Sequence, residues 1–177
     1  MNEAGRILRR LLDRLYDVAG VLAAFCLILI LVAIAVQVVA RWFAVPLHGP
    51  ADYAGYLMAA ASFLAFAHTL NHGAHIRVGL LLNFLGEKRF WGELWCLLIA
   101  SAGSAYLSWY AIKMVYWSWL LGDVSQGQDA TPLWIAQMPV AVGSVILAIC
   151  FLDNLVTLLL TGRDNIVVNS SETSRAE

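Results

Sequence analysis

The sequence VAGVLAAFCLILILVAIAVQVVA, residues 18–40, decides the fold, because it runs for 23 residues without a charge. As an α-helix it would be about 35 Å long, enough to cross the roughly 30 Å hydrocarbon core of a bilayer. It exceeds the roughly 7–15 apolar residues of a signal-peptide core, so we expect a retained span. Arginines flank it on both sides: Arg6, Arg9, Arg10, Arg14 and Arg41. The chain is therefore predicted to be a membrane protein.

The composition supports this interpretation. The 177 residues are 61% hydrophobic and 13% charged, whereas soluble domains are about 25% charged. The net charge of −1, without a basic stripe outside the membrane flanks, argues against a nucleic-acid partner. The three cysteines (Cys26, Cys96 and Cys150) lie inside apolar runs, which argues against disulfides and against a thiolate metal site.

Three further apolar runs follow, at about residues 52–71, 91–120 and 133–161. With residues 18–40 they predict an all-α integral membrane protein of four transmembrane helices, forming a single domain over residues 1–161. Pro139 is expected to start or kink the fourth helix. Residues 162–177 are polar and are predicted to form a disordered tail.

The basic residues predict the orientation. Nine Lys and Arg residues fall in the N-terminal segment, the loop between the second and third spans, and the tail; only Arg41 and Lys113 fall on the other side. By the positive-inside rule both termini should be cytoplasmic. Aromatic residues should mark the interfaces: Phe90, Trp91 and Trp95 inside, and Trp42, Phe43, Trp109, Tyr110, Tyr116, Trp117, Trp119 and Trp134 outside.

Segments between the spans also carry patterns. Residues 6–16 alternate leucines and arginines at helical spacing, which predicts an amphipathic helix lying on the phospholipids of the inner leaflet. Residues 78–85 predict a second, short interfacial helix. The outer loop, residues 122–131, is rich in Gly, Gln and Asp and is expected to be flexible.

His68, His72 and His75 would share one face of a continuous helix, the spacing of metal or haem ligands. A cytochrome b-type anchor of a redox complex is therefore an alternative function. The other three spans contain no histidine, so the usual second axial ligand is missing and we expect neither cofactor nor metal. The sequence has no nucleotide fingerprint or convincing nucleophile–base pair, so we do not expect an enzyme.

Asp153 is the most unusual single residue, because a carboxylate at the centre of an apolar span costs about 2.5–3.5 kcal/mol. It should face protein or water. Arg14 or a basic residue of another subunit is the expected partner, and a hydrated position at the inner interface is the alternative.

Three short motifs stand at the ends of the spans. They are Arg41-Trp42-Phe43 followed by Pro46, His75-Ile76-Arg77-Val78, and Pro132-x-Trp134. In this order, on four spans, they resemble the DctQ-type small membrane subunit of tripartite ATP-independent periplasmic (TRAP) transporters over about residues 15–161. The family often has an acidic residue at the position of Gly79, so any contact that such an acid makes is absent or replaced here.

The resemblance implies a small subunit of the bacterial inner membrane that braces a large, sodium-driven elevator subunit. It also implies a docking platform for a periplasmic binding protein that delivers an organic acid or similar solute. The small subunit itself would bind neither solute nor sodium. Candidate contacts with partner or lipid are Arg41, Trp42 and Pro46 at the outer end, His75, Arg77 and Val78 at the inner end, and Asp153.

Overall fold

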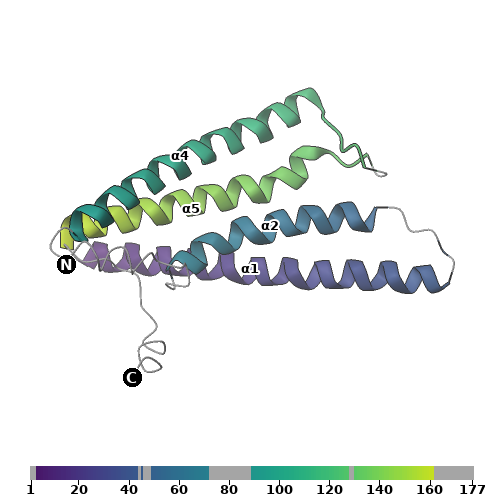
Figure 1. Ribbon diagram of the computed structural model, residues 1–177, viewed down its shortest axis with the longest axis horizontal. Coiled ribbons are helices and arrows are strands. Elements are labelled where there is room, and N and C mark those ends of the chain that lie inside the picture. Colours follow the sequence, from purple (N-terminus) through teal and green to yellow (C-terminus); the bar gives the residue numbers. More distant parts are fainter. Residues whose placement is uncertain (1–2, 44, 46–48, 72–88, 128–129, 162–177) are drawn as a thin grey trace, which may run out of the picture.

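The computed structural model describes residues 3–43, 45, 49–71, 89–127 and 130–161. These residues form four helices: α1 (Glu3–Trp42), α2 (Pro50–Asn71), α4 (Arg89–Leu121) and α5 (Leu133–Thr161), shown in Figure 1. Each is long and apolar enough to cross a membrane. The expectation of an all-helical chain with four membrane-length helices is confirmed.

The helices lie side by side in the order α1, α2, α5, α4 (Figure 1). α1 packs on α2, α2 on α5 and α5 on α4, while α1 reaches α5 only slightly. In an apolar stretch of 18 residues within each span, the buried share is 11% in α1 and 22% in α4, against 28% in α2 and 33% in α5. α1 and α4 are therefore the edges of an open row, and both have a long side on which none of the described residues packs.

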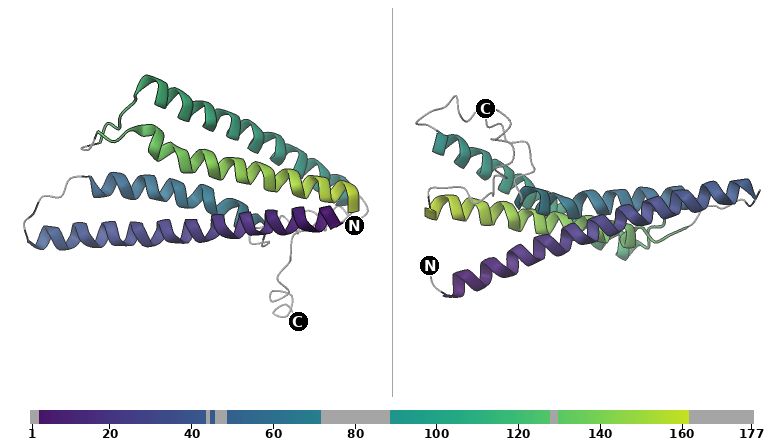
Figure 2. Two further views of the ribbon diagram at one scale, coloured as in Figure 1. Left: turned by 180° about the vertical axis from the view of Figure 1, so that it is seen from behind. Right: turned by 90° about the horizontal axis from the view of Figure 1, so that it is seen from below.

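The two ends of the row differ in chemistry. α1 and α4 begin, and α2 and α5 end, at one end, which carries Arg9, Arg10 and Arg14 and is called the basic end here. Trp42, Trp119 and Trp134 lie at the opposite, aromatic end. The right-hand view of Figure 2 shows the helices overlapping along the middle and fanning apart at the basic end.

Helix α1 is continuous from Glu3 to Trp42. The surface helix expected at residues 6–16 is therefore continuous with the first span, because α1 contains no proline and its two glycines, Gly5 and Gly20, are tolerated singly. The expected interfacial helix at 78–85 and the tail at 162–177 lie outside the described residues.

α1 contacts its neighbours through one narrow stripe. The buried or half-buried residues between positions 12 and 41 are Asp13, Gly20 and a set spaced alternately by four and three: Leu12, Tyr16, Ala19, Ala23, Cys26, Ile30, Ala33, Gln37 and Ala40. This is the seam of a left-handed helix pair, and its small side chains let the backbones approach closely. Gln37, the polar residue of the first span, therefore sits at a helix contact instead of facing lipid.

α4 packs on α5 through a matching seam of small hydroxyls. From position 101 onward the buried or half-buried residues of α4 are Ser101, Ser104, Ser108, Ala111, Val115 and Ser118. We call this set the serine seam. The Ser108 hydroxyl donates to the Ser104 carbonyl at 2.8 Å and to the Ser144 carbonyl of α5 at 2.7 Å. Bonds to carbonyls satisfy these hydroxyls where no water is present.

α2 and α5 make the closest backbone contact. A Cβ atom placed on Gly143 of α5 would lie 2.6 Å from the backbone carbon of Phe63 in α2. Toward the basic end, α1, α2 and α5 share the hydrophobic core, whose buried members are Tyr16, Ala19, Ala67, Leu70, Ile146 and Cys150. The glycine brings α2 and α5 together and thereby helps to close this core.

The described residues at the aromatic end are joined by several hydrogen bonds. α2 starts with Pro50, a favoured first residue, after Gly49 with φ of 100°. The loop expected to be flexible is paired at its base, with the Ser125 amide donating to the Thr131 carbonyl at 2.8 Å. Tyr53 bonds to Thr131 at 3.2 Å, and Tyr56 bonds to Ser125. Two tyrosines of α2 thus contact the described residues of this loop, and its expected flexibility stays a prediction.

Candidate functional site

Polar groups meet where α1, α2 and α5 converge near the basic end. Tyr16 of α1 is completely buried, and its hydroxyl lies beside the thiol of Cys150 in α5, which is also buried. The thiol donates to the Ala67 carbonyl of α2 at 3.7 Å. The Asn154 amide, one turn further along α5, donates to the Cys150 carbonyl at 2.9 Å. We call these side chains, with Asp13 and Asp153, the polar junction.

The charged members of the polar junction come from α1 and α5. Asp153 is half-buried, and the charges that act on it among the described residues are those of Arg9 and Asp13. The expected intramolecular partner was Arg14, and this expectation is wrong. Arg9 precedes Tyr16 by seven residues and shares its face of α1, whereas Arg14 lies two residues before Tyr16 and is rotated by about 200° to the exposed side.

A second contact of polar groups links α1 and α2. The imidazole Nδ1 of His68 lies 3.5 Å from the carboxylate of Asp17. Gly20 makes room for it, because a Cβ there would lie 2.7 Å from the imidazole ring carbon of His68. His68 therefore faces an acidic residue of the neighbouring helix; His72 and His75 lie outside the described residues.

Of the residues predicted to make contacts at the outer end, the structure describes Arg41 and Trp42. Arg41 and Trp42 form the last turn of α1 at the aromatic end, and both are exposed. Trp42 is 82% exposed, so no described part of this chain covers it. Pro46, His75, Arg77 and Val78 lie outside the described residues, so their roles stay predictions.

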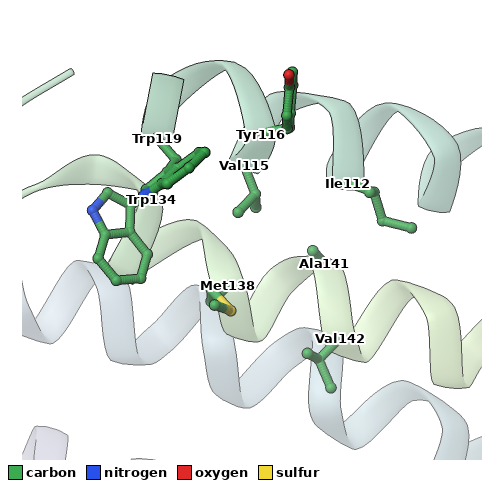
Figure 3. Close-up of a pocket in the computed structure, with 8 residues that line it drawn as sticks. All are labelled: Ile112, Val115, Tyr116, Trp119, Trp134, Met138, Ala141 and Val142. Atoms are coloured by element: carbon green, nitrogen blue, oxygen red, sulfur yellow. The ribbon is translucent and has the colours of Figure 1, made fainter. Parts of the chain in front are cut away.

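α4 and α5 diverge toward the aromatic end and leave an apolar cavity of about 430 Å³. Figure 3 shows Ile112, Val115 and Trp119 of α4 across from Trp134, Met138 and Ala141 of α5. The side chains that line this cavity are mostly bulkier than the small residues that hold α4 and α5 together nearer the basic end. The lining is almost entirely apolar, so the cavity suits a hydrocarbon group and not a charged solute.

The sequence signals for the polar junction were weak. Asp153 stands out in any hydropathy profile, but Tyr16 resembles an ordinary interfacial tyrosine and Cys150 an apolar filler. The signal was their register: Tyr16 falls on the small-residue stripe of α1, and Cys150 and Asn154 are one turn apart on α5.

The polar junction has the chemistry of a structural network. Its thiol donates a hydrogen bond from α5 to α2, and its amide donates one within α5. The Tyr16 hydroxyl of α1 is buried beside the thiol without a hydrogen-bond partner among the described residues, and the charge of Arg9 acts on Asp153. Among the described residues, no group of three or more His, Cys, Asp and Glu side chains is arranged to hold a metal ion. The arrangement can fix the register of α1, α2 and α5 within a membrane.

Comparison with known families places residues 30–161 in one of them. The matching family model is described as "Tripartite ATP-independent periplasmic transporters, DctQ component". The match takes in the last third of α1 and all of α2, α4 and α5. Comparisons with curated proteins and with solved structures gave no match.

Proposed function

Because this chain belongs to the DctQ component family of TRAP transporters, we propose that it is the small membrane subunit that braces the scaffold of a large elevator-type subunit. In this role it helps to form the platform on which a periplasmic binding protein docks. The transporter is driven by sodium and takes up an organic acid or similar solute. The observation that carries the proposal is the family match over residues 30–161.

Features of the described chain support a bracing role. The open row of helices offers long apolar sides to other membrane proteins, and α1 and α4 each pack on this chain through one stripe. Buried hydroxyls and the polar junction fix the helices relative to one another. The cavity described above is lined by apolar groups, which fits a subunit that leaves solute binding to its partner.

The proposal includes an orientation. α1 begins and α5 ends at the same end of the row, next to Arg9, Arg10 and Arg14 (Figure 1). The positive-inside rule assigns this end to the cytoplasm. The ordered loop around Ser125 and the exposed Trp42 then lie on the periplasmic side of the inner membrane, where a binding protein can reach them.

Affinity purification of the tagged chain from its native membrane in mild detergent tests the proposal. Mass spectrometry should find a stoichiometric, many-spanned partner, and liposomes containing both subunits and the binding protein should take up solute only with a sodium gradient. A chain that purifies alone and transports by itself would contradict the proposed role.

The same purified sample distinguishes the transporter subunit from the alternative, a cytochrome b-type anchor. Such an anchor would co-purify with redox proteins and show a haem absorption band near the Soret region. Family membership favours the transporter, and an absorption spectrum of the purified complex checks that preference directly.

A further inference from the structure

α4 carries a second stripe, opposite the serine seam, that no described residue covers. Its members are spaced by three or four along the helix, and all are exposed: Trp95, Ile99, Ala102, Tyr106, Tyr110 and Lys113. We call this set the tyrosine face. Tyr106 is 65% exposed and Tyr110 is 50% exposed. Because α4 is an edge of the row, the tyrosine face points away from the rest of the described chain.

The tyrosine face reaches the middle of the membrane. Trp95 and Trp117 mark the two ends of the span, and Tyr106 stands eleven residues from each. At 1.5 Å per residue its Cα is about 16 Å from either tryptophan, so its hydroxyl cannot reach an interface. Tyr110 lies one turn nearer the aromatic end, eleven residues before α4 ends at Leu121.

Hydrogen-bond donors on this face exceed the acceptors that the described chain supplies. The ring centroids of Tyr106 and Tyr110 lie 4.6 Å apart. Two phenols provide two protons, and even a bond between the two hydroxyls would use only one of them. Among the described residues no acceptor outside the pair meets the second proton. An unsatisfied donor in hydrocarbon is costly, and lipid tails offer no acceptor.

We propose that the tyrosine face is the site at which a transmembrane helix of the large transporter subunit packs, accepting a hydrogen bond from the Tyr106–Tyr110 pair. This inference rests on the proposed function. Ala102 and the neighbouring Gly103, over which nothing lies within 4 Å, let a helix approach closely. The Lys113 ammonium, about 10 Å further toward the aromatic end, suits a carboxylate or helix C-terminus on the same partner.

Photo-crosslinking in the native membrane identifies the occupant. The full chain carries p-benzoylphenylalanine in place of Tyr106, and in a control in place of the adjacent Leu107, which points about 100° away. The proposal expects a light-dependent product containing the large subunit from position 106, and much less from position 107. Products from position 106 that contain only lipid, or a second copy of this chain, would overturn it.

Matched substitutions test the face without a photoreactive group. Ala102→Leu places bulk on the tyrosine face, whereas Ala105→Leu places the same bulk on an exposed position beside it; neither side chain is buried in this chain. We expect A102L to lower the yield of co-purified large subunit by about tenfold or more, because small residues set the approach of membrane helices, and A105L to leave it within about twofold. Equal effects of both would contradict the proposal.

The hydroxyls are tested by a variant that keeps the rings. The double change Tyr106→Phe and Tyr110→Phe should lower the same yield by about fivefold, equivalent to about 1 kcal/mol for one intramembrane hydrogen bond. An unchanged yield would remove the hydrogen bond from the proposal. If the unaltered chain brings down no large subunit, the proposed function itself fails; if it does and position 106 captures only lipid, the function stands and the assignment of this face fails.

Discussion

Single glycines and hydroxyls determine how closely these helices approach. The tightest point is Gly143 of α5 against the backbone of Phe63 in α2. Gly103 of α4 is the opposite case, because a methyl group there meets nothing within 4 Å. Both glycines lie inside apolar helices, so the sequence alone does not distinguish them. They differ in how closely a neighbouring helix packs against them.

Gly143→Ala should therefore destabilise the protein, since the added methyl group must push α2 and α5 apart. We expect a loss of about 1–3 kcal/mol, the usual cost of overpacking a tight contact. Thermal unfolding of the purified chain in mild detergent measures it. Gly103→Ala is the matched control and should be neutral or slightly stabilising, because alanine favours the helix. Equal melting temperatures for both variants would show that the α2–α5 contact is not limiting.

The residue scale is also where sequence reasoning stopped short. The sequence predicted Asp153 as a residue needing protection, because its charge is visible without a structure. It did not predict that Arg9, instead of Arg14, faces it, because this choice depends on which stripe of α1 turns toward α5. Because residues 18–40 are apolar on every face of α1, hydropathy does not reveal which stripe contacts the other helices. The small residues Ala19, Ala23 and Cys26 were the available signal.

At the scale of helices, packing stripes and not hydrophobicity determine the arrangement. The four helices were predictable because hydropathy and length are sums over many residues, which tolerate local exceptions. Their order in the row was not predictable, because lipid and protein surroundings select similar apolar side chains. The serine seam of α4 is the informative exception, since hydroxyls inside a membrane indicate a helix contact.

Two substitutions of Ser108 test whether the serine seam depends on the hydroxyl group or on the small size of the side chain. Ser108→Ala removes one bond to the Ser144 carbonyl and should cost only about 0.6 kcal/mol, the average for such bonds in membrane proteins. Ser108→Leu also forces bulk into a buried position and should cost about 1–3 kcal/mol. Unfolding in mixed micelles, followed by tryptophan fluorescence, compares the two. Equal losses would indicate that the hydroxyl, not its small size, holds α4 to α5.

The loop at the aromatic end owes its order to α2. Tyr56 bonds to Ser125 and Tyr53 to Thr131, partners more than 65 residues apart in sequence, so these contacts were not visible in the local sequence of the loop. Tyr53→Phe with Tyr56→Phe keeps the rings and removes both bonds. Amide hydrogen exchange at Ser125 should rise by about fivefold for each lost bond worth about 1 kcal/mol.

The helices themselves should not change in the tyrosine double variant. Circular dichroism should show unaltered helical content, and exchange in α5 should stay as in the unaltered chain. If the loop amides exchange no faster, its order comes from the backbone pairing of Ser125 with Thr131 alone.

At the scale of the whole molecule, the two ends of the row of helices carry different structural features. The aromatic end carries the ordered loop and exposed Trp42, while the basic end carries the polar junction that joins α1, α2 and α5. Asp153 lies twenty residues along α5 from Leu133, about 30 Å from the aromatic end. A change at Asp153 therefore acts on the assembly of helices and subunits and not on a protein docked at the other end.

Asp153→Leu should accordingly lower the yield of the assembled transporter more than it alters solute affinity. The charge of Arg9 favours the half-buried carboxylate, and loss of the carboxylate leaves that arginine with Asp13, one turn along its own helix. We expect about fivefold less complex, equivalent to about 1 kcal/mol for a partly exposed pair. Co-purification of the large subunit measures the yield, and solute uptake by the complexes that do form measures affinity. Val156→Leu, at an exposed position on the same helix, is the control and should change neither quantity. Unchanged yield with altered affinity would place Asp153 on the solute pathway and contradict its structural role.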